Sequence, residues 1–270
     1  MLHIFTLGNN ENEIECLKRS AAKQNVNINV LVFDKWNGYV DKIIHMNNAI
    51  RDIPDNDIVC FIDAYDVLLF TDENEILEKF REYDCDLLLS AELNCYPGEN
   101  IHTYDLLYRK LNLENMTNFK YVNSGGYIGY KHAIQKLYDW KTLDEIHEIS
   151  GLGGDQNYFT QYYLHHAAIP ENRVKIDMYQ RIFQSMYKIQ FEGIEFVNGR
   201  LYNNVLKVKP CFVHFNGYGG YYFQIYRGIY REDIRHFFLR KIDESKDGGL
   251  HNLDGYRSPY EGQYANIPQL

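Results

Sequence analysis

The sequence predicts an α/β fold in which a mostly parallel, mixed central sheet is flanked by helices. The chain has 270 residues, of which 45% are hydrophobic, so it is long enough to bury a full core. In the first half, short apolar runs alternate with amphipathic stretches, as in βαβ units. Past residue 120 the pattern of short strands and helices becomes irregular, and we therefore expect the sheet to be mixed.

The first half contains the most regular elements. The expected strands are 3–7, 28–33, 57–62 and 86–91, and the expected helices are 11–24, 40–52 and 73–83. The last helix has the clearest start, because Asp72 is a suitable N-cap and Glu75 stands three residues later, at the spacing of a capping box. Ile76, Leu77 and Phe80 then fall on one face.

The second half predicts shorter elements. The segment 121–130 is expected to form a glycine-interrupted strand or a hairpin, with helices to follow around 131–140 and 155–165. Further strands are expected at 174–178, 194–197 and 210–215, and a final helix within 221–241. The absence of a repeat or linker predicts one domain over 1–241, followed by a polar tail over 242–270.

Charge and cysteine content exclude some functions. The formal net charge is −9, which argues against nucleic acid as a partner and is compatible with a basic peptide ligand or a bound cation. The five cysteines are widely spaced and show no CxxC pattern, so a structural zinc site is not expected. Cys60 and Cys211 lie in apolar runs and are interpreted as core residues, whereas a Cys85–Cys95 pair stays open.

Two carboxylates follow the apolar strand 57–62. Asp63 and Asp66 are three residues apart, and ligands of open α/β sheets bind beyond the carboxyl ends of strands. Such oxygen ligands can hold Mn²⁺ or Mg²⁺, which would bridge a diphosphate and stabilise the charge of a departing nucleoside diphosphate. The alternative is an ordinary turn, in which aspartate is common.

A second strand end carries His214, Asn216 and Gly217. His214 is a candidate third metal ligand, and an imidazole beside two carboxylates favours Mn²⁺ over Mg²⁺. Asn216 and the glycine amides are candidate phosphate ligands. The alternative is a structural histidine with satisfied hydrogen bonds.

Two further segments place a polar residue beside glycines. Asp155 follows Gly153 and Gly154, which allow a close backbone approach to a ligand, so Asp155 is either a sugar-binding carboxylate or a helix N-cap. Asn123 precedes Gly125 by two residues and is either a sugar-contacting amide or part of a strained turn.

Taken in order, these segments resemble the glycosyltransferase domain of the procollagen lysyl hydroxylases and the related stand-alone collagen glucosyltransferases of giant viruses. The matching stretches are Trp36-Asn37-Gly38, Phe61-Ile62-Asp63-Ala64-Tyr65-Asp66-Val67, Ser90-Ala91-Glu92-Leu93-Asn94-Cys95-Tyr96-Pro97, Val122-Asn123-Ser124-Gly125-Gly126-Tyr127-Ile128-Gly129, Asp155-Gln156, Arg181-Ile182-Phe183-Gln184 and Val213-His214-Phe215-Asn216-Gly217. Together they span about residues 1–220.

The resemblance implies a GT-A fold, with a nucleotide-binding half over about 1–120 and an acceptor-binding half over about 121–241. It implies that Asp63, Asp66 and His214 bind Mn²⁺ and that Asp155 and Asn123 act at the reaction centre. The donor-binding residues that it implies are Trp36, Lys42, Asp63, Tyr65, Asp66, Asn216 and Gly217.

The activity that the resemblance implies is transfer of glucose from UDP-glucose to galactosyl-hydroxylysine of collagen, with retention at the anomeric carbon. Two alternatives stay open: a galactosyltransferase that acts on hydroxylysine, and an inactive module that binds UDP-sugar or collagen. The chain departs from the family at Tyr96 and His45, where the family has tryptophan, and in the acidic run before Asp155, of which only Asp155 is kept. These departures concern the acceptor more than the donor.

No segment is apolar and long enough for a signal peptide or a membrane helix. We therefore expect a soluble chain without membrane insertion, in the host cytoplasm or the virion if it is viral, and in a secretory compartment only if it is targeted by other means. A tyrosine-rich stretch around Tyr221–Tyr230 is interpreted as either a homodimer contact or packing on the domain.

Overall fold

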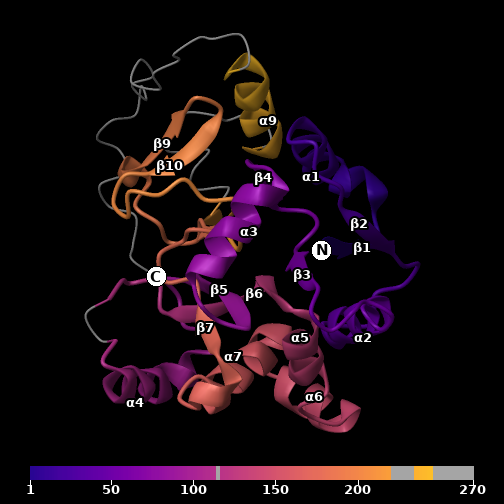
Figure 1. The fold of residues 1–270 in the computed structure, drawn as a ribbon, viewed down its shortest axis with the longest axis vertical. Coiled ribbons are helices and arrows are strands. Elements are labelled where there is room, and N and C mark those ends of the chain that lie inside the picture. The colour runs from indigo at the N-terminus through magenta and orange to yellow at the C-terminus, as the bar shows by residue number, and fades with distance from the viewer. Residues whose placement is uncertain (114–115, 220–233, 246–270) are drawn as a thin grey trace.

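The structure is a computed structural model that describes residues 1–113, 116–219 and 234–245. Its largest sheet has six strands in the order β2-β1-β3-β6-β5-β7. Helices pack against this sheet (Figure 1), and the described residues also form a separate three-stranded sheet. The α/β architecture predicted from the sequence is therefore confirmed.

The strands of the six-stranded sheet are β1 (Leu2–Gly8), β2 (Asn29–Val32), β3 (Ile58–Ile62), β5 (Leu87–Glu92), β6 (Tyr121–Tyr130) and β7 (Val174–Ile176). β1 is parallel to β2 and β3, and β5 is parallel to β7. β6 is antiparallel to both of its neighbours, β3 and β5. One reversed strand among six makes the sheet mixed and mostly parallel, as predicted.

The remaining strands form two small sheets. β4 (Val67–Leu69), β11 (Phe212–His214) and β8 (Phe183–Ser185) form a three-stranded sheet in the order β4-β11-β8. β9 (Ile194–Val197) and β10 (Arg200–Asn203) form an antiparallel hairpin. The helices are α1 (Glu11–Lys23), α2 (Val40–Ala49), α3 (Glu73–Glu82), α4 (Ile101–Leu111), α5 (Lys131–Tyr138), α6 (Leu143–Ser150), α7 (Gly154–His166) and α9 (Ile234–Ser245), with short 3₁₀ turns at Gly98–Asn100, Pro170–Asn172 and Phe191–Gly193.

Alternate residues of β3 face the two sides of the large sheet. Val59 and Phe61 join a core with residues of α2, α5 and α7, whereas Ile58, Cys60 and Ile62 join a second core with residues of α1 and α3. All five residues of β3 are buried because both faces are covered. A fully apolar strand therefore carries the chain to the point where Asp63 follows.

Several elements differ from the prediction. The segment 121–130 forms the single strand β6 rather than a hairpin, with an irregular register opposite Leu89 and Ser90. The helices α4 and α6 and the short strands β4, β8 and β10 were not predicted. β4 and β8 have three residues each and are paired through β11, so local sequence periodicity carries little signal for them.

Helix α9 packs on a third core. Phe237, Phe238, Leu239 and Ile242 of this helix cluster with residues that include Phe70 of the segment after β4. α9 lies beside α1 (Figure 1) and continues to Ser245, so the predicted tail does not begin at residue 242. The rest of that tail and the tyrosine-rich stretch around 221–230 fall outside the described residues.

Cys85 and Cys95 are not joined in a disulfide, so the pairing that the sequence left open is not formed. Cys60 and Cys211 are buried, as predicted for core residues. In the described part of the chain, no helix has the length and apolar character needed to cross a membrane.

Candidate metal and sugar-transfer site

A cleft of about 1110 Å³ opens where β3 ends and includes residues from both halves of the chain. Every candidate site residue named from the sequence lines this cleft: Trp36, Lys42, Asp63, Tyr65, Asp66, Asn123, Asp155, His214, Asn216 and Gly217. The structure therefore brings together residues as far apart in the sequence as Trp36 and Gly217.

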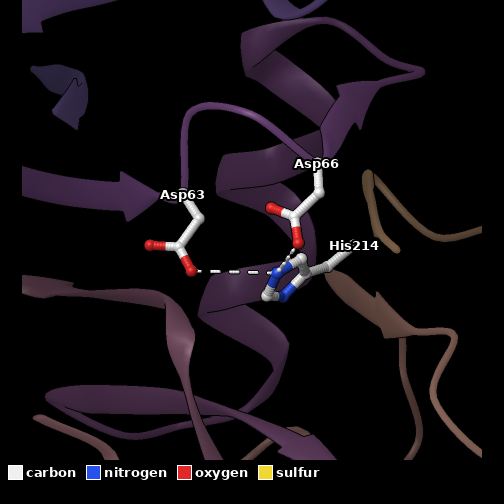
Figure 2. A group of neighbouring side chains, drawn as sticks. All are labelled: Asp63, Asp66 and His214. Carbon is white, nitrogen blue, oxygen red and sulfur yellow. Dashed lines mark hydrogen bonds and ion pairs between the residues drawn. The ribbon is translucent and has the colours of Figure 1, made fainter. Parts of the chain in front are cut away.

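Asp63, Asp66 and His214 form a compact group of potential metal ligands. One ligand atom from each lies within 4.8 Å of the others. His214 Nε2 is 3.1 Å from Asp66 Oδ2 and 3.7 Å from Asp63 Oδ2, and the three side chains point toward a common centre (Figure 2). Two carboxylates and an imidazole are a suitable donor set for Mn²⁺ or a similar divalent cation.

Strand pairing explains why His214 reaches the acidic loop. β11 pairs with β4 so that His214 lies opposite Val67, the residue that follows Asp66. Beyond this pair, the Phe215 amide donates to the Asp66 carbonyl at 2.8 Å. The metal group thus joins β3 of the large sheet to β4 and β11 of the small sheet.

Gly125 on β6 leaves the space that this group occupies. A Cβ atom at this position would lie 2.2 Å from His214 Cε1 and 2.6 Å from Asp63 Oδ2. The Gly125 carbonyl also accepts the Asp63 amide at 2.9 Å. The glycine is therefore required by the close approach of β6 to two of the potential metal ligands.

The pKa directions follow from burial and charge. Burial raises the pKa of Asp63 above its ordinary value, despite the opposing effects of Lys42 and His214. Burial would also raise the pKa of Asp66, but the charge of His214 and its hydrogen bond outweigh this effect and lower that pKa. Burial would lower the pKa of His214, but Asp66 and Asp63 outweigh it and raise the pKa.

Lys42 connects the metal group to Asp155. Its Nζ atom lies 3.0 Å from Asp63 Oδ1 and 2.6 Å from Asp155 Oδ2, and it donates to the Ser124 carbonyl at 3.4 Å. Burial would lower the pKa of Lys42, but the two carboxylates outweigh it and raise the pKa, so the side chain is an ammonium. Lys42 thereby bridges the carboxylates of Asp63 and Asp155 and restricts the distance between them.

Asp155 is not the N-cap of its helix. α7 begins at Gly154, and its N-cap is Gly153 at φ 86°, so Asp155 lies within the first turn. A carboxylate there is favoured by the helix dipole, and the side chain is buried against Lys42. Of the two sequence-based alternatives, the N-cap role is wrong.

Asn123 is held by its neighbours on both sides. Its Oδ1 atom accepts the Gly125 amide at 3.0 Å, and its Nδ2 atom donates to Glu92 Oε1 at 3.2 Å. Asn123 is buried but lies at the cleft wall. Its orientation depends on the carboxylate of Glu92, which the sequence analysis did not select as a site residue.

Glu92 is the main residue that sequence reasoning missed. It ends β5, it is 3% exposed, and its oxygens accept from Asn123, Gln156 at 2.9 Å and Asn216 at 3.2 Å. Burial raises the pKa of Glu92, and the three amide donors oppose this shift. The available signal was a carboxylate at the end of the apolar strand 86–91, the same pattern that identified Asp63.

Asn216 shapes its loop rather than presenting a free side chain. Its Oδ1 atom accepts from Ser185 Oγ and from the Met186 and Tyr187 amides, at 2.8 to 3.1 Å. Its Nδ2 atom donates to Glu92. Gly217 adopts φ +56° against the Tyr187 ring, a backbone conformation that favours glycine.

Aromatic side chains line the outer part of the cleft. Trp36 is 39% exposed, and its ring makes an edge contact with the ring of Tyr39 at 6.2 Å. Tyr65 Oη accepts the Asn9 amide at 2.7 Å, which places its ring over Gly8 at the end of β1. Of the two departures from the resemblance, Tyr96 lines the cleft and is exposed. His45 stacks on Phe33 at 5.2 Å and is not among the lining residues.

Comparison with known proteins shows the family of this chain. The family model described as the PLOD GT domain, where GT stands for glycosyltransferase, matches residues 1–230. A procollagen-lysine,2-oxoglutarate 5-dioxygenase of Drosophila melanogaster is 28% identical over 64% of this chain and 24% of its own length. A multifunctional procollagen lysine hydroxylase and glycosyltransferase of Caenorhabditis elegans is 28% identical over 77% of this chain and 29% of its own length.

A viral protein is similar to the same extent. The uncharacterized protein R699 of Acanthamoeba polyphaga mimivirus is 28% identical over 68% of this chain and 38% of its own length. The chain thus spans well under half the length of each of these three relatives.

Proposed function

This chain belongs to the family of PLOD glycosyltransferase domains, and on that premise we propose that it is a Mn²⁺-dependent glycosyltransferase that uses a UDP-sugar. The observation that carries the proposal is the group of Asp63, Asp66 and His214 in the cleft, with Lys42 and Asp155 directly beside it. Family membership supports the reaction class, and the donor set supports the metal.

Asp63, Asp66 and His214 would hold Mn²⁺. When bound there, the ion would supply Lewis-acid stabilisation of the charge that develops on the departing diphosphate. Lys42 adds a fixed ammonium on the Asp155 side of the metal group. Trp36 and Tyr65 offer aromatic surfaces at the cleft wall for the nucleoside, and the amides near Gly217 would bind phosphate.

We propose UDP-glucose as the donor and galactosyl-hydroxylysine of a collagen-like protein as the acceptor. The acceptor oxygen forms a bond to the anomeric carbon of glucose, and the bond from that carbon to the UDP oxygen breaks. The acceptor proton passes to the departing diphosphate on the same face, which preserves the anomeric configuration. Asn123 and Asp155 orient the sugar hydroxyls during this step.

Two other functions fit fewer observations. A galactosyltransferase that acts on hydroxylysine would use the same metal and nucleotide residues and differ at the sugar. An inactive UDP-sugar or collagen-binding module would have no need for the complete set of Asp63, Asp66, His214 and Asp155. Presence of all four in one cleft favours an enzyme.

The test is a transfer assay with two donors and two acceptors. UDP-glucose and UDP-galactose are each combined with collagen peptides that carry galactosyl-hydroxylysine or hydroxylysine, with Mn²⁺ or with EDTA. We expect glucosylation of galactosyl-hydroxylysine that EDTA abolishes. The Asp66→Ala variant is expected to lose about 100-fold or more in rate, because it removes an electrostatic partner of the departing group.

Each alternative function predicts a different pattern of sugar transfer in this assay. Transfer from UDP-galactose to hydroxylysine would replace the glucosyltransferase by the galactosyltransferase. Binding of a collagen peptide without turnover of either donor would favour the binding module. Full activity of Asp66→Ala would contradict the metal assignment.

A further inference from the structure

The metal loop between β3 and β4 contacts a helix near the end of the described chain. This loop, residues 63–66, carries Asp63 and Asp66 and has Tyr65 between them. Arg235 of α9 donates through Nη1 to the Tyr65 carbonyl at 2.5 Å. α9 begins at Ile234, beyond the residues 1–230 that match the family model.

The same helix contacts the segment that carries the third ligand. Phe215 follows His214, and its ring lies 5.3 Å from the ring of Phe238 on α9. Phe238 is 1% exposed and also packs against Phe70, which follows β4. α9 thus contacts the residue before Asp66 and the residue after His214, and none of the three potential metal ligands belongs to α9 itself.

Further contacts fix α9 against α1. Arg235 Nη2 forms an ion pair with Glu13 Oε2 at 3.1 Å, and Arg235 Nη1 also donates to the Glu13 carbonyl at 3.3 Å. Cys16 Sγ lies 3.7 Å from His236 Nε2, and Lys23 forms an ion pair with Asp243. The Arg235 guanidinium is mostly buried, with 16% of its side chain exposed, so its direction is set by these partners.

We propose that Arg235 is a positioning residue for the metal site and that α9, through Arg235, restricts the conformation of the metal loop. The guanidinium holds the Tyr65 carbonyl, and this hold restricts the backbone between Asp63 and Asp66. The two carboxylates then face His214 before an ion arrives. A metal ion binds more tightly to such a preorganised site because less backbone freedom is lost on binding.

Tyr65 shows why this single contact is effective. Its hydroxyl group accepts the amides of Asn9 and Asn10 and donates to Asn9 Oδ1, so the side chain is tied to the start of α1. Its carbonyl is tied to α9 by Arg235, which is itself paired with Glu13 of α1. Loss of the guanidinium releases the backbone of the loop while the tyrosine ring stays in place.

The inference rests on the proposed metal-dependent function, and its test measures metal binding directly. Mn²⁺ is titrated into the full chain without donor or acceptor, and free Mn²⁺ is followed by electron paramagnetic resonance. The thermal unfolding midpoint of each variant is measured without metal. For Arg235→Ala we expect the Mn²⁺ dissociation constant to rise about 10-fold or more.

Two variants serve as matched controls. Glu13→Gln removes the ion pair with Arg235 but leaves the guanidinium free to donate to Tyr65, so Mn²⁺ affinity should change less than about 2-fold. Arg240→Ala removes another arginine of α9, one that lies over the Phe237 ring, and should leave the affinity unchanged. Arg235→Lys keeps a shorter donor and should weaken binding less than Arg235→Ala.

The outcomes separate this inference from the proposed function. If the unaltered chain binds Mn²⁺ and Arg235→Ala binds it equally well, the positioning role of Arg235 is wrong and the metal site is retained. If all variants lose Mn²⁺ affinity in proportion to the decrease in their unfolding midpoints, Arg235 contributes only to general stability and the proposal is overturned. If the unaltered chain binds no Mn²⁺, the metal-dependent function itself fails.

Discussion

Some side chains near the cleft face the cleft, and others fix the orientation of those side chains. Asn123, Gln156 and Asn216 come from β6, α7 and the loop after β11, and each donates an amide hydrogen to Glu92. A buried carboxylate with three amide donors sets their orientation, because each amide would lose its partner in any other rotamer. Glu92 therefore acts on the site through its neighbours.

We expect Glu92→Gln to lower the rate of sugar transfer by about 10-fold or more. The substitution turns one acceptor oxygen into an amide donor that faces another donor, which typically costs about 1–3 kcal/mol for a buried group. Steady-state kinetics with UDP-glucose and the acceptor peptide measures this effect.

Ser90→Ala is the matched control for that substitution. Ser90 lies two residues earlier on β5, and its buried hydroxyl has no hydrogen-bond partner among the described residues. Transfer by this variant should stay close to that of the unaltered chain. Equal losses of transfer rate in both variants would show that any substitution on β5 lowers activity and that Glu92 has no specific role.

Among the secondary-structure elements, α3 shows how a predicted helix is fixed in the tertiary structure. Asp72 Oδ1 accepts the Glu75 amide at 3.0 Å, as the capping pattern predicted. The Glu75 side chain instead reaches β10, where Arg200 donates to both of its oxygens at 2.6 and 2.8 Å. One residue thus contributes to the helix start and to a contact between α3 and the β9–β10 hairpin.

The carboxylate of Glu75 predicts a pH dependence of stability. Partial burial alone would raise its pKa, but hydrogen bonds from Arg200, Lys79 and Thr71 outweigh it and lower the pKa from its ordinary 4.5 to about 2. A lowered folded-state pKa stabilises the fold above about pH 4.5, and this stabilisation is lost as the pH falls from there toward 2.

Glu75→Gln should therefore lower the free energy of unfolding by roughly 1.5–3 kcal/mol at neutral pH. The difference from the unaltered chain should shrink between about pH 4.5 and pH 2. Denaturant unfolding at several pH values measures it, with Glu78→Gln, an exposed position on the same helix, as the control. A difference that is constant with pH would contradict the role of the Glu75 charge.

Across the molecule, the metal group joins segments that are far apart in the sequence. Asp66 and His214 are separated by 148 positions, and Asp63 directly follows β3 of the large sheet whereas His214 belongs to the small sheet. A ligand that binds only the folded arrangement stabilises it by linkage, by about 2.7 kcal/mol at a concentration 100 times its dissociation constant.

Mn²⁺ at such a concentration should raise the thermal unfolding midpoint by roughly 5–10 °C for a chain of this length. Differential scanning calorimetry with Mn²⁺ or with EDTA measures the shift. Asp66→Ala should show almost none, because it loses one of the three ligands. A shift of the same size in that variant would mean that Mn²⁺ stabilises the fold from another site.

Local sequence determined the elements whose signal is contained in a few neighbouring residues. The apolar run that becomes β3, the cap of α3 and the carboxylates after β3 depend on spacings of two to four residues, and all were recognised. Local patterns also selected His214, Asn123 and Asp155 as candidates, and the resemblance to known motifs added Trp36, Lys42 and Tyr65. No local pattern could show that these residues line one cleft.

Only the tertiary structure decided which of these residues meet and what supports them. The three-residue strands β4 and β8 exist because β11 lies between them, and β11 is what brings His214 to Asp66. Glu92 and Arg235 were not recognised from the sequence because their partners lie 31 to 222 positions away. Hydrogen bonds and burial at such separations depend on chain packing, and packing leaves no periodic trace in the sequence.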